Sequence, residues 1–181
     1  AEPAAEQLHV CGTMRWRTAN RFAAPIVVRM PGGFFKCGDP WHSQSNEAEF
    51  LHATGWRLAM PSNAEDAVGL LRTAMRGNDP VVFFEHRSLL DGAAARRPYP
   101  GDDFMLPFGV ARTLRSGSEL TVVSWGAMVE RCDQAAGESG IDVDLLDLRT
   151  LSPWDRAAVL ASVARTRRCL IVHEDTITAG F

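Results

Sequence analysis

Residues 56–85 read WRLAMPSNAEDAVGLLRTAMRGNDPVVFFE, and they set the fold class of the chain. A short strand is predicted at Trp56–Met60 and a second, buried strand at Pro80–Glu85. Between the strands, apolar residues recur at helical spacing and form one stripe, so a helix is predicted there. Ser62 is expected to cap this helix, and Glu65 three residues later completes a capping box. Strand, helix and strand in this order predict a parallel sheet with a right-handed crossover.

The residues on either side of this unit extend the pattern. A helix is predicted over residues 6–17, a strand over 25–30 and a short helix over 46–52. Residues 91–107 are punctuated by proline, glycine and paired arginines, which predicts no regular element and indicates a linker between two domains. We therefore expect a first domain at 1–90, a linker at 91–107 and a second domain at 108–181.

A second α/β unit is predicted after the linker. Its first helix is expected to open at Gly126. Ser152 is expected to cap its second helix, with Pro153 at the first helical position and the helix end near Thr166. Alternating strands and helices predict a parallel sheet covered by helices, so the fold class is α/β in both domains. The strands of this unit are expected at 120–124, 141–148 and 169–173.

Composition and charge describe an ordinary globular chain. The 181 residues carry a formal net charge of −3, with 23% charged and 46% hydrophobic residues. This excludes a disordered tail, a collagen-like repeat and a strongly basic nucleic-acid binder. The apolar runs are only a few residues long, whereas roughly 20 residues are needed to cross a bilayer. We expect no membrane span, and no signal peptide at residues 1–6, which include acids.

The cysteines and histidines indicate no metal site. The four cysteines, at positions 11, 37, 132 and 169, form no Cys-x-x-Cys pair. We expect reduced thiols in a cytoplasmic protein, with Cys132 and Cys169 as small core residues of apolar segments. The five histidines form no cluster with metal-ligand spacing, so a structural zinc is not expected. No dinucleotide-binding motif, P-loop or nucleophile elbow occurs either.

One segment has a more specific character, namely WHSQSNEA at residues 41–48. Other segments flank it in a fixed order: IVVRMPGG at 26–33, MPS at 60–62, FEH at 84–86, TVVSWGAM at 121–128, DLRTL at 147–151 and VHE at 172–174. Together, from about Glu6 to Phe181, they resemble the β chain of the decarboxylating component of 2-oxoacid dehydrogenase complexes, such as the pyruvate and branched-chain types. The residues at 60–67 and 84–87 are similar to those of a bacterial form of this enzyme in which the α and β parts are fused in one chain.

The resemblance implies a domain organisation and a reaction. It implies the C-terminal half of a transketolase-type pyrimidine-binding domain, then an incomplete transketolase C-terminal-type domain, in a chain cut at both ends. The implied reaction decarboxylates a 2-oxoacid and reductively acylates a lipoyl group. The implied cofactors are thiamine diphosphate and Mg2+, held mostly by a missing part or a partner, because the activating glutamate and the diphosphate motif are absent. The implied partners are an α chain or α part, a second β part and a lipoyl acyltransferase core, without nucleic acid or membrane.

The resemblance also implies site residues. His42 is implied as the catalytic residue that donates or relays a proton, whereas the residue alone favours a loop histidine that caps a helix. His86 and His173 end predicted parallel strands, where a hydrogen-bonded structural histidine is the simpler interpretation. A monovalent cation, K+, is implied at a helix end, where carbonyls are unpaired, although a glycine-terminated helix without an ion is the alternative. The aligned positions are Ile26, Ala74, Met75, Gly77 and Asp79.

Three functional hypotheses stay open on the sequence. The first is the β part of a thiamine-dependent 2-oxoacid dehydrogenase. The second is another transketolase-type enzyme, such as a ketol transferase or a deoxyxylulose-phosphate synthase, against which the His-Ser-Gln-Ser segment at 42–45 argues. The third is a non-catalytic module that mediates assembly, which the absent activating glutamate favours for this stretch taken alone.

Overall fold

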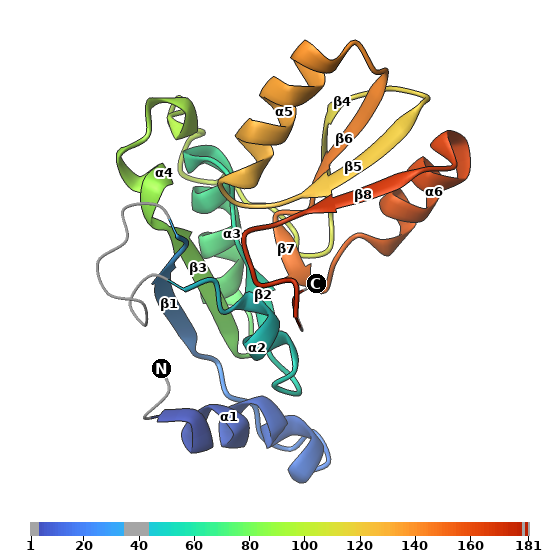
Figure 1. The fold of residues 1–181 in the computed structure, drawn as a ribbon. Helices are drawn as coiled ribbons and strands as arrows, with labels where there is room; N and C mark the ends of the chain where they lie inside the picture. Colours follow the sequence, from blue (N-terminus) through green and yellow to red (C-terminus); the bar gives the residue numbers. More distant parts are fainter. Residues whose placement is uncertain (1–3, 35–43, 179, 181) are drawn as a thin grey trace.

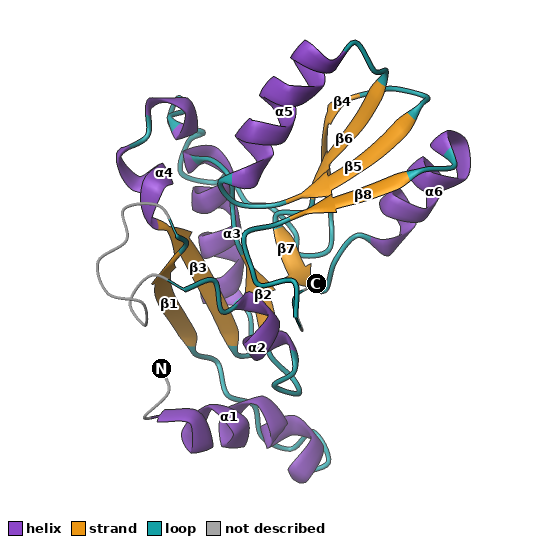
Figure 2. Ribbon diagram, in the orientation of Figure 1, coloured by secondary structure: helices purple, strands orange, loops and turns teal. Residues whose placement is uncertain are grey.

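Two four-stranded sheets with helices packed on them make up the chain (Figure 1). The computed structural model describes residues 4–34, 44–178 and 180. Helices and strands alternate along most of this length, and the strands gather into two separate groups (Figure 2). The predicted α/β class with mainly parallel sheets is therefore confirmed.

The first sheet has the strand order β1-β3-β2-β7. The strands β1 (Val27–Gly32), β3 (Val81–His86) and β2 (Arg57–Ala59) are parallel, and all three were expected from the sequence. The fourth strand, β7 (Thr150–Ser152), comes from the second half of the chain and pairs antiparallel with β2. It escapes prediction because three residues are too few to show a period.

The helix α3 (Ala64–Arg76) connects β2 to β3 and packs its apolar stripe on the sheet. Its N-cap is Asn63, whose side chain accepts a hydrogen bond from the backbone N–H of Asp66 at 3.0 Å. The prediction that Ser62 caps this helix is wrong. The Ser62 hydroxyl instead donates to the carboxylate of Asp147 in the second half of the chain, at 2.6 Å. The local pattern predicts that Ser62 caps the helix, but its hydroxyl is engaged in a tertiary hydrogen bond instead.

Shorter elements complete the first half. They are α1 (Ala5–Arg17), α2 (Glu47–Leu51), α4 (Arg87–Asp91) and the 3-10 helix η3 (Ala93–Ala95). The indole N–H of Trp56 holds α1 by donating to the carbonyl of Leu8 at 2.9 Å. The stretch 91–107 was expected to contain no regular element, and η3 shows that part of it is helical.

The second sheet has the strand order β4-β6-β5-β8. The strand β5 runs parallel to β6 and β8, whereas β4, which was not predicted, is antiparallel to β6. Two helices cover opposite faces, α5 (Met128–Ser139) on apolar side chains and α6 (Arg156–Thr166) on polar ones (Figure 1). The strands are β4 (Arg112–Arg115), β5 (Leu120–Ser124), β6 (Val143–Asp147) and β8 (Cys169–Val172).

The starts of both helices in this half differ from the prediction. Gly126 has a φ of 57° and lies before the first turn of α5. Ser152 ends β7, and its hydroxyl donates to the carbonyl of Trp56 at 3.0 Å, so it does not cap α6. Asp155 caps α6 instead, since its side chain accepts from the N–H of Ala158 at 2.9 Å. A partner from the other half of the chain again overrides the local capping pattern.

The largest hydrophobic cluster joins the two halves. It contains Leu58 and Phe84 from the first sheet, and Val123 and Trp125 from the second. Leu58 and Phe84 are 0% and 1% exposed, so this contact is a true core and not a surface contact. A large apolar interface of this kind holds two domains in one arrangement. The residues that meet across it therefore have fixed positions relative to each other.

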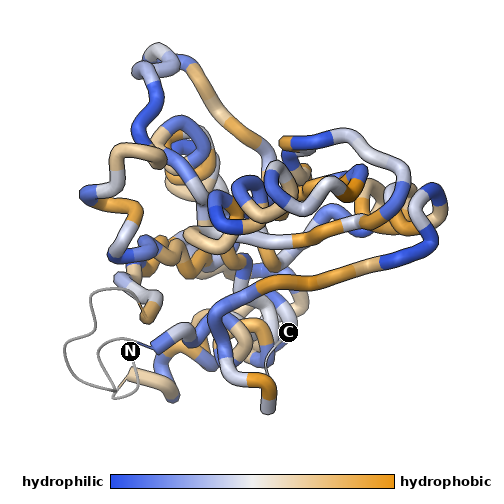
Figure 3. Tube along the Cα trace, turned by 45° about the horizontal axis from the view of Figure 1, so that its top comes forward, coloured by the Kyte–Doolittle hydropathy of each residue, from blue (hydrophilic) through white to orange (hydrophobic). Residues whose placement is uncertain are grey.

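The outermost strand of the second sheet, β8, is exposed, although a buried strand was predicted. Its apolar residues form an orange segment in Figure 3. Leu170 and Ile171 are 50% and 52% exposed. Cys169 is exposed as well, so its prediction as a core residue is wrong, whereas Cys132 is buried as predicted. A run of apolar residues occurs in central strands and in edge strands alike, so the sequence pattern could not distinguish a buried strand from an exposed one.

Candidate functional site

The carboxyl ends of β1 and β3 meet residues from the second half of the chain. Gly32 at the end of β1 is in register with His86 at the end of β3. The segment that follows β8 returns to this edge of the first sheet, and its Glu174 contacts His86 (Figure 1). Ligands of parallel α/β sheets bind at the carboxyl ends of the strands. This edge is therefore the candidate site.

His42, the implied catalytic residue, lies outside the described residues. Gly33 and Gln44 stand on either side of the stretch 35–43 that contains it. The backbone N–H of Gly33 donates to the carbonyl oxygen of Gln44 at 3.2 Å, so the chain before and after this stretch is joined at the end of β1. Gly33 has a φ of 95°, a conformation that favours glycine.

Glu47 is a buried acid at the start of α2, with 1% of its surface exposed. Its Oε1 accepts a hydrogen bond from Nε1 of Trp125 at 3.1 Å. Its Oε2 is also buried and has no hydrogen-bond partner among the residues described. Burial is the main cause that raises the pKa of this carboxyl, and the nearby acids Asp175 and Glu174 raise it further. These surroundings oppose ionisation of the Glu47 carboxyl.

His86 is fully buried and bonded on both sides of its ring. The backbone N–H of Ser88 donates to Nδ1 at 3.3 Å, so Nδ1 is an acceptor and the ring proton is on Nε2. Nε2 donates to Oε2 of Glu174 at 2.5 Å. Hydrogen bonds to a carboxylate are shorter and stronger than those between neutral groups. The interpretation of His86 as a bonded histidine at a strand end is confirmed.

His173 supports the same edge from the second sheet. Its ring stacks on Trp125, with centroids 5.7 Å apart and planes within 5° of parallel. Its Nδ1 accepts a hydrogen bond from the backbone N–H of Asp175 at 3.1 Å, as expected for a bonded histidine at a strand end. His173 and Glu47 thus contact the same indole, one through its face and the other through its N–H.

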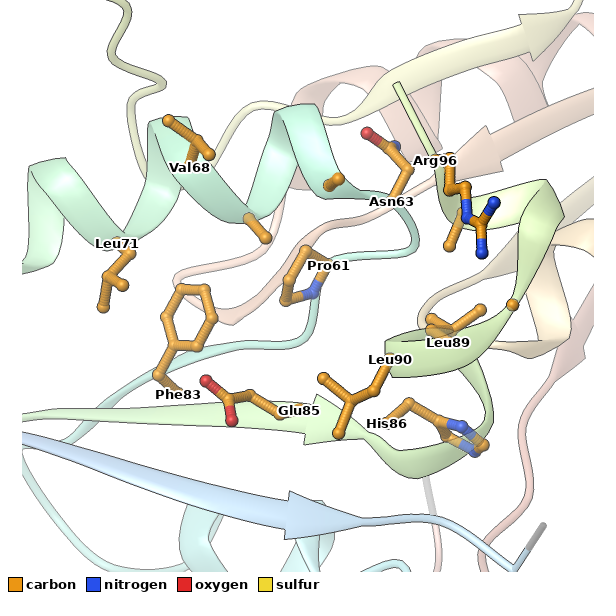
Figure 4. A pocket seen from close by; sticks show the side chains of 14 residues that line it. Pro61, Asn63, Val68, Leu71, Phe83, Glu85, His86, Leu89, Leu90 and Arg96 are labelled. Atoms are coloured by element: carbon orange, nitrogen blue, oxygen red, sulfur yellow. The ribbon is translucent and has the colours of Figure 1, made fainter. Parts of the chain in front are cut away.

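A cavity of about 330 Å³ borders the site on the side of α3 (Figure 4). Apolar side chains such as Val68, Leu71 and Phe83 make most of its wall. The carboxylate of Glu85 points into the space between β3 and α3, whereas the imidazole of His86 turns away from it at the rim (Figure 4). The volume suits a small molecule, but the paired polar groups of the site lie on the other side of His86.

A second polar contact between the two halves lies at the start of α3. Asp147 accepts from the hydroxyl of Ser62 at 2.6 Å and from the backbone N–H of Arg149 at 3.0 Å. Complete burial raises the pKa of Asp147 to about 6, and repulsion from Asp66 adds to the effect. The Nε of Arg149 is 3.3 Å from Oδ2 of Asp66, which is an ion pair without the alignment of a hydrogen bond.

The residues implied to hold a monovalent cation lie at the opposite, amino end of the first sheet. Ala74 lies in the last turn of α3 and Gly77 follows the helix; the Gly77 N–H donates to the Ala74 carbonyl at 3.2 Å. Ile26 is next to this turn because its carbonyl accepts from the N–H of Val81 at 2.9 Å. The structure thus brings Ile26 to the end of α3, where the last carbonyls have no partner within the helix.

Side chains at this turn offer little to a cation. Asp79 is paired with Arg15 at 2.6 Å and with Arg57 at 2.7 Å. Burial alone would raise the pKa of Asp79, but the bonds from the two arginines lower it overall. Met75 is 70% exposed. A cation at this turn would therefore be held by backbone carbonyls.

Within 4–34, 44–178 and 180, no group of three or more His, Cys, Asp or Glu side chains is arranged to hold a metal ion. Over the same ranges, no helix has the length and hydropathy that a membrane crossing needs.

Family comparisons agree with the fold. The transketolase pyrimidine-binding domain matches residues 12–92, and the transketolase C-terminal domain matches residues 109–181. One similar solved structure is a split-gene transketolase in an inactive β4 tetramer, with a TM-score of 0.67. The aligned part covers 96% of this chain and 57% of the transketolase chain. At 19% identity that likeness shows the fold alone. Transketolase-type pyrimidine-binding and C-terminal domains thus match the chain in this order.

The chain is related to β subunits of 2-oxoacid dehydrogenases. It is 40% identical over 99% of its length to the 2-oxoisovalerate dehydrogenase subunit beta 2 of Arabidopsis thaliana. It is 41% identical over 90% of its length to the 2-oxoisovalerate dehydrogenase subunit beta of Bacillus subtilis. The pyruvate dehydrogenase E1 component subunit beta of Bacillus subtilis is 36% identical over 92% of the chain. The chain covers 51%, 50% and 52% of these relatives, so it spans about half their length.

Three residues of this edge had no role in the sequence analysis, although they lie in the segments quoted there. They are Glu47, Trp125 and Glu174. An acid within the largely apolar stretch that follows Asn46 is a weak sign of a buried carboxyl. The partners could not be foreseen, because Glu47 and Trp125 are 78 positions apart and meet only through the packing of the two sheets.

Proposed function

We propose that the chain is part of the β subunit, or of the β part of a fused chain, of a thiamine-dependent 2-oxoacid dehydrogenase. The reaction decarboxylates a 2-oxoacid and reductively acylates a lipoyl group. One observation carries the proposal: identities of 36–41% to such β subunits extend over 90–99% of the chain and cover both domains in order. The likeness to transketolase rests on 19% identity and supports the fold only, so it does not favour ketol transfer.

Thiamine diphosphate and Mg2+ are the cofactors of this reaction, and the chain supplies only part of their site. The described residues offer the carboxyl edge of a pyrimidine-binding domain. The sequence contains no diphosphate-binding motif. Under this proposal the diphosphate and Mg2+ are held mostly by the α part or by another stretch of the β part.

His42 is the group that we propose to donate or relay a proton in this reaction. Its position in sequence supports this role, because it precedes the segment Gln44–Glu47, whose last residue is bonded to Trp125 of the second domain. Histidine titrates near neutral pH and is the usual choice for proton transfer. The partners under this proposal are the α part, a second β part and the lipoyl acyltransferase core, in the cytoplasm of a bacterial-type cell.

The function is tested on the whole protein that contains this chain, expressed with its α part. We expect release of CO2 from a 2-oxoacid and reduction of a lipoyl acceptor, both dependent on added thiamine diphosphate. A comparison of pyruvate with a branched-chain 2-oxoacid identifies the substrate. Transfer of ketol groups between sugar phosphates, without lipoyl reduction, would contradict the proposal.

The 181-residue chain by itself is expected to bind thiamine diphosphate and Mg2+ negligibly. The reason is that the resemblance places the activating glutamate outside this chain, and the sequence contains no diphosphate-binding motif. Isothermal titration calorimetry measures this, with the complete α/β protein as the positive control. Micromolar binding by the chain alone would show that the diphosphate site has been assigned to the wrong part.

We also propose a monovalent cation at the turn from Ala74 to Asp79, beside Ile26. The Met75 and Gly77 carbonyls and the negative end of the α3 dipole support it. K+ is then expected to raise the Tm of the complete enzyme more than Na+ at equal ionic strength, because only the folded state binds the ion. Choline chloride provides the baseline for ionic strength. Identical melting curves in K+ and Na+ would remove the cation from this turn.

A further inference from the structure

Two polar bridges run from the second domain to the carboxyl edge of the first sheet. In one, Oε2 of Glu174 accepts from Nε2 of His86 at 2.5 Å. In the other, Nε1 of Trp125 donates to Oε1 of Glu47 at 3.1 Å. The side chains of His86 and Glu174 are 0% and 10% exposed, so water does not compete for their bond. Hydrogen bonds are stronger in such surroundings than in water.

The first bridge bears directly on the backbone at the end of β1. A Cβ atom built on Gly33 would lie 2.1 Å from Nε2 of His86, so the imidazole is packed against the bare backbone of this glycine. The N–H of Gly33 donates to the carbonyl of Gln44 at 3.2 Å. A shift of the imidazole toward this backbone would therefore displace Gly33 and, with it, the contact to Gln44.

The orientation of the imidazole depends on Glu174. Nδ1 is held by the backbone N–H of Ser88 at 3.3 Å and lies 2.8 Å from the hydroxyl oxygen of the same residue. The bond from Nε2 to Glu174 ties the opposite end of the ring to the second domain. A carboxylate behind a histidine fixes both the tautomer and the orientation of the ring, as in catalytic triads.

We propose that Glu174 of the second domain is a positioning residue for the proposed reaction, acting through His86 on the contact between Gly33 and Gln44. The proposal rests on the proposed function, because His42 lies between those two residues in sequence. Glu174 does not touch substrate or cofactor in this scheme. It makes the second domain part of the catalytic apparatus by fixing the backbone at the end of β1.

The test compares two variants of the complete enzyme, Glu174→Gln and Asp175→Asn. Each removes one of the two acids that raise the pKa of Glu47, and only the first removes the carboxylate behind His86. Small misplacements of reacting groups cost up to about 100-fold in rate. Glu174→Gln is expected to lower kcat about 10- to 100-fold with little change in KM or Tm. Asp175→Asn is expected to stay within about twofold of wild type, and Glu174→Asp, which keeps a carboxylate, recovers part of kcat.

A second measurement does not depend on activity. In protein with 15N-labelled histidine, the Nε2 proton of His86 is expected at unusually low field, because it lies in a short bond to a carboxylate. The signal should persist in Asp175→Asn and disappear in Glu174→Gln. A Glu174→Gln enzyme with wild-type kcat after loss of the signal would overturn the positioning role. A loss of activity that only follows a loss of folded protein would overturn it as well, in favour of a structural role.

The same measurements separate this inference from the proposed function. A wild-type enzyme without 2-oxoacid decarboxylation would overturn the function and the positioning role together. The His86 signal would still show whether Glu174 holds the imidazole. A signal unchanged in all the variants would refute the bridge itself, whatever the enzyme catalyses.

Discussion

Replacement of His42 by alanine in the complete enzyme is expected to reduce turnover with the lipoyl acceptor by about 10²–10⁴-fold, the usual scale for a lost general acid or base. Tm and cofactor binding should stay near wild type, because a residue that only transfers protons contributes little to a core. The measurement is the steady-state rate of lipoyl reduction per folded molecule, together with a melting curve.

His52→Ala is the matched control for His42→Ala. His52 is an exposed histidine at the end of α2, ten positions further along the chain. Its removal should leave turnover within about twofold of wild type, as for most surface changes. If His42 caps a helix instead, the pattern reverses, with a loss of roughly 1 kcal/mol in stability and little change in turnover. An active His42→Ala enzyme would end the catalytic assignment.

Asp147→Asn is expected to remove a pH-dependent loss of stability of about 3 kcal/mol. Burial raises the pKa of Asp147 to about 6 in the folded chain, against roughly 4 in an unfolded one. The folded state therefore holds the proton more tightly, and stability falls as the pH rises through the interval from about 4 to 6. Above pH 6 both states are ionised and the loss is complete. The asparagine cannot ionise: its carbonyl oxygen can accept from the Arg149 N–H in place of Oδ1, and its NH2 group, in place of Oδ2, can donate to the Ser62 hydroxyl oxygen.

The measurement for Asp147→Asn is the difference in unfolding free energy between variant and wild type, taken from pH 4 to pH 8. It should grow in favour of the variant up to about pH 6 and then level off. Asp133→Asn is the control, since it removes a half-exposed carboxylate paired with Arg115 at 2.6 Å, and such pairs contribute about 0–1 kcal/mol. A pH-independent difference for Asp147→Asn would mean that this carboxyl stays ionised in the folded protein.

Elements with a clear local period were predictable from the sequence. Residues 56–85 contain two apolar strands around an amphipathic helix, and β2, α3 and β3 lie where that pattern places them. Elements without a period were not predictable. The three residues of β7 and the polar strand β4 form only because β2 and β6 offer them open edges.

The caps show where local rules fail. Ser62 and Ser152 both have the composition of an N-cap, yet each hydroxyl donates to an atom in the other half of the chain. The helices then use Asn63 and Asp155, which lie nearby and whose Oδ1 atoms accept from the first turn. The other oxygen of Asp155 accepts from the N–H of Ala111 at 2.9 Å, so this side chain serves both contacts. The sequence alone does not show which acceptor each serine hydroxyl bonds to, because those acceptors come within reach only when the two sheets pack together.

The candidate site divides in the same way. Local sequence motifs were sufficient to identify the family resemblance and the segment around His42. They also located the two histidines that end strands. Each of these inferences depends on residues that are close together in the chain. The partners of those residues depend on the shared core around Phe84 and Trp125. That core brings Glu174 to His86 across 88 positions and Trp125 to Glu47 across 78. Contacts at such separations follow from the packing of the sheets, since no local period encodes them.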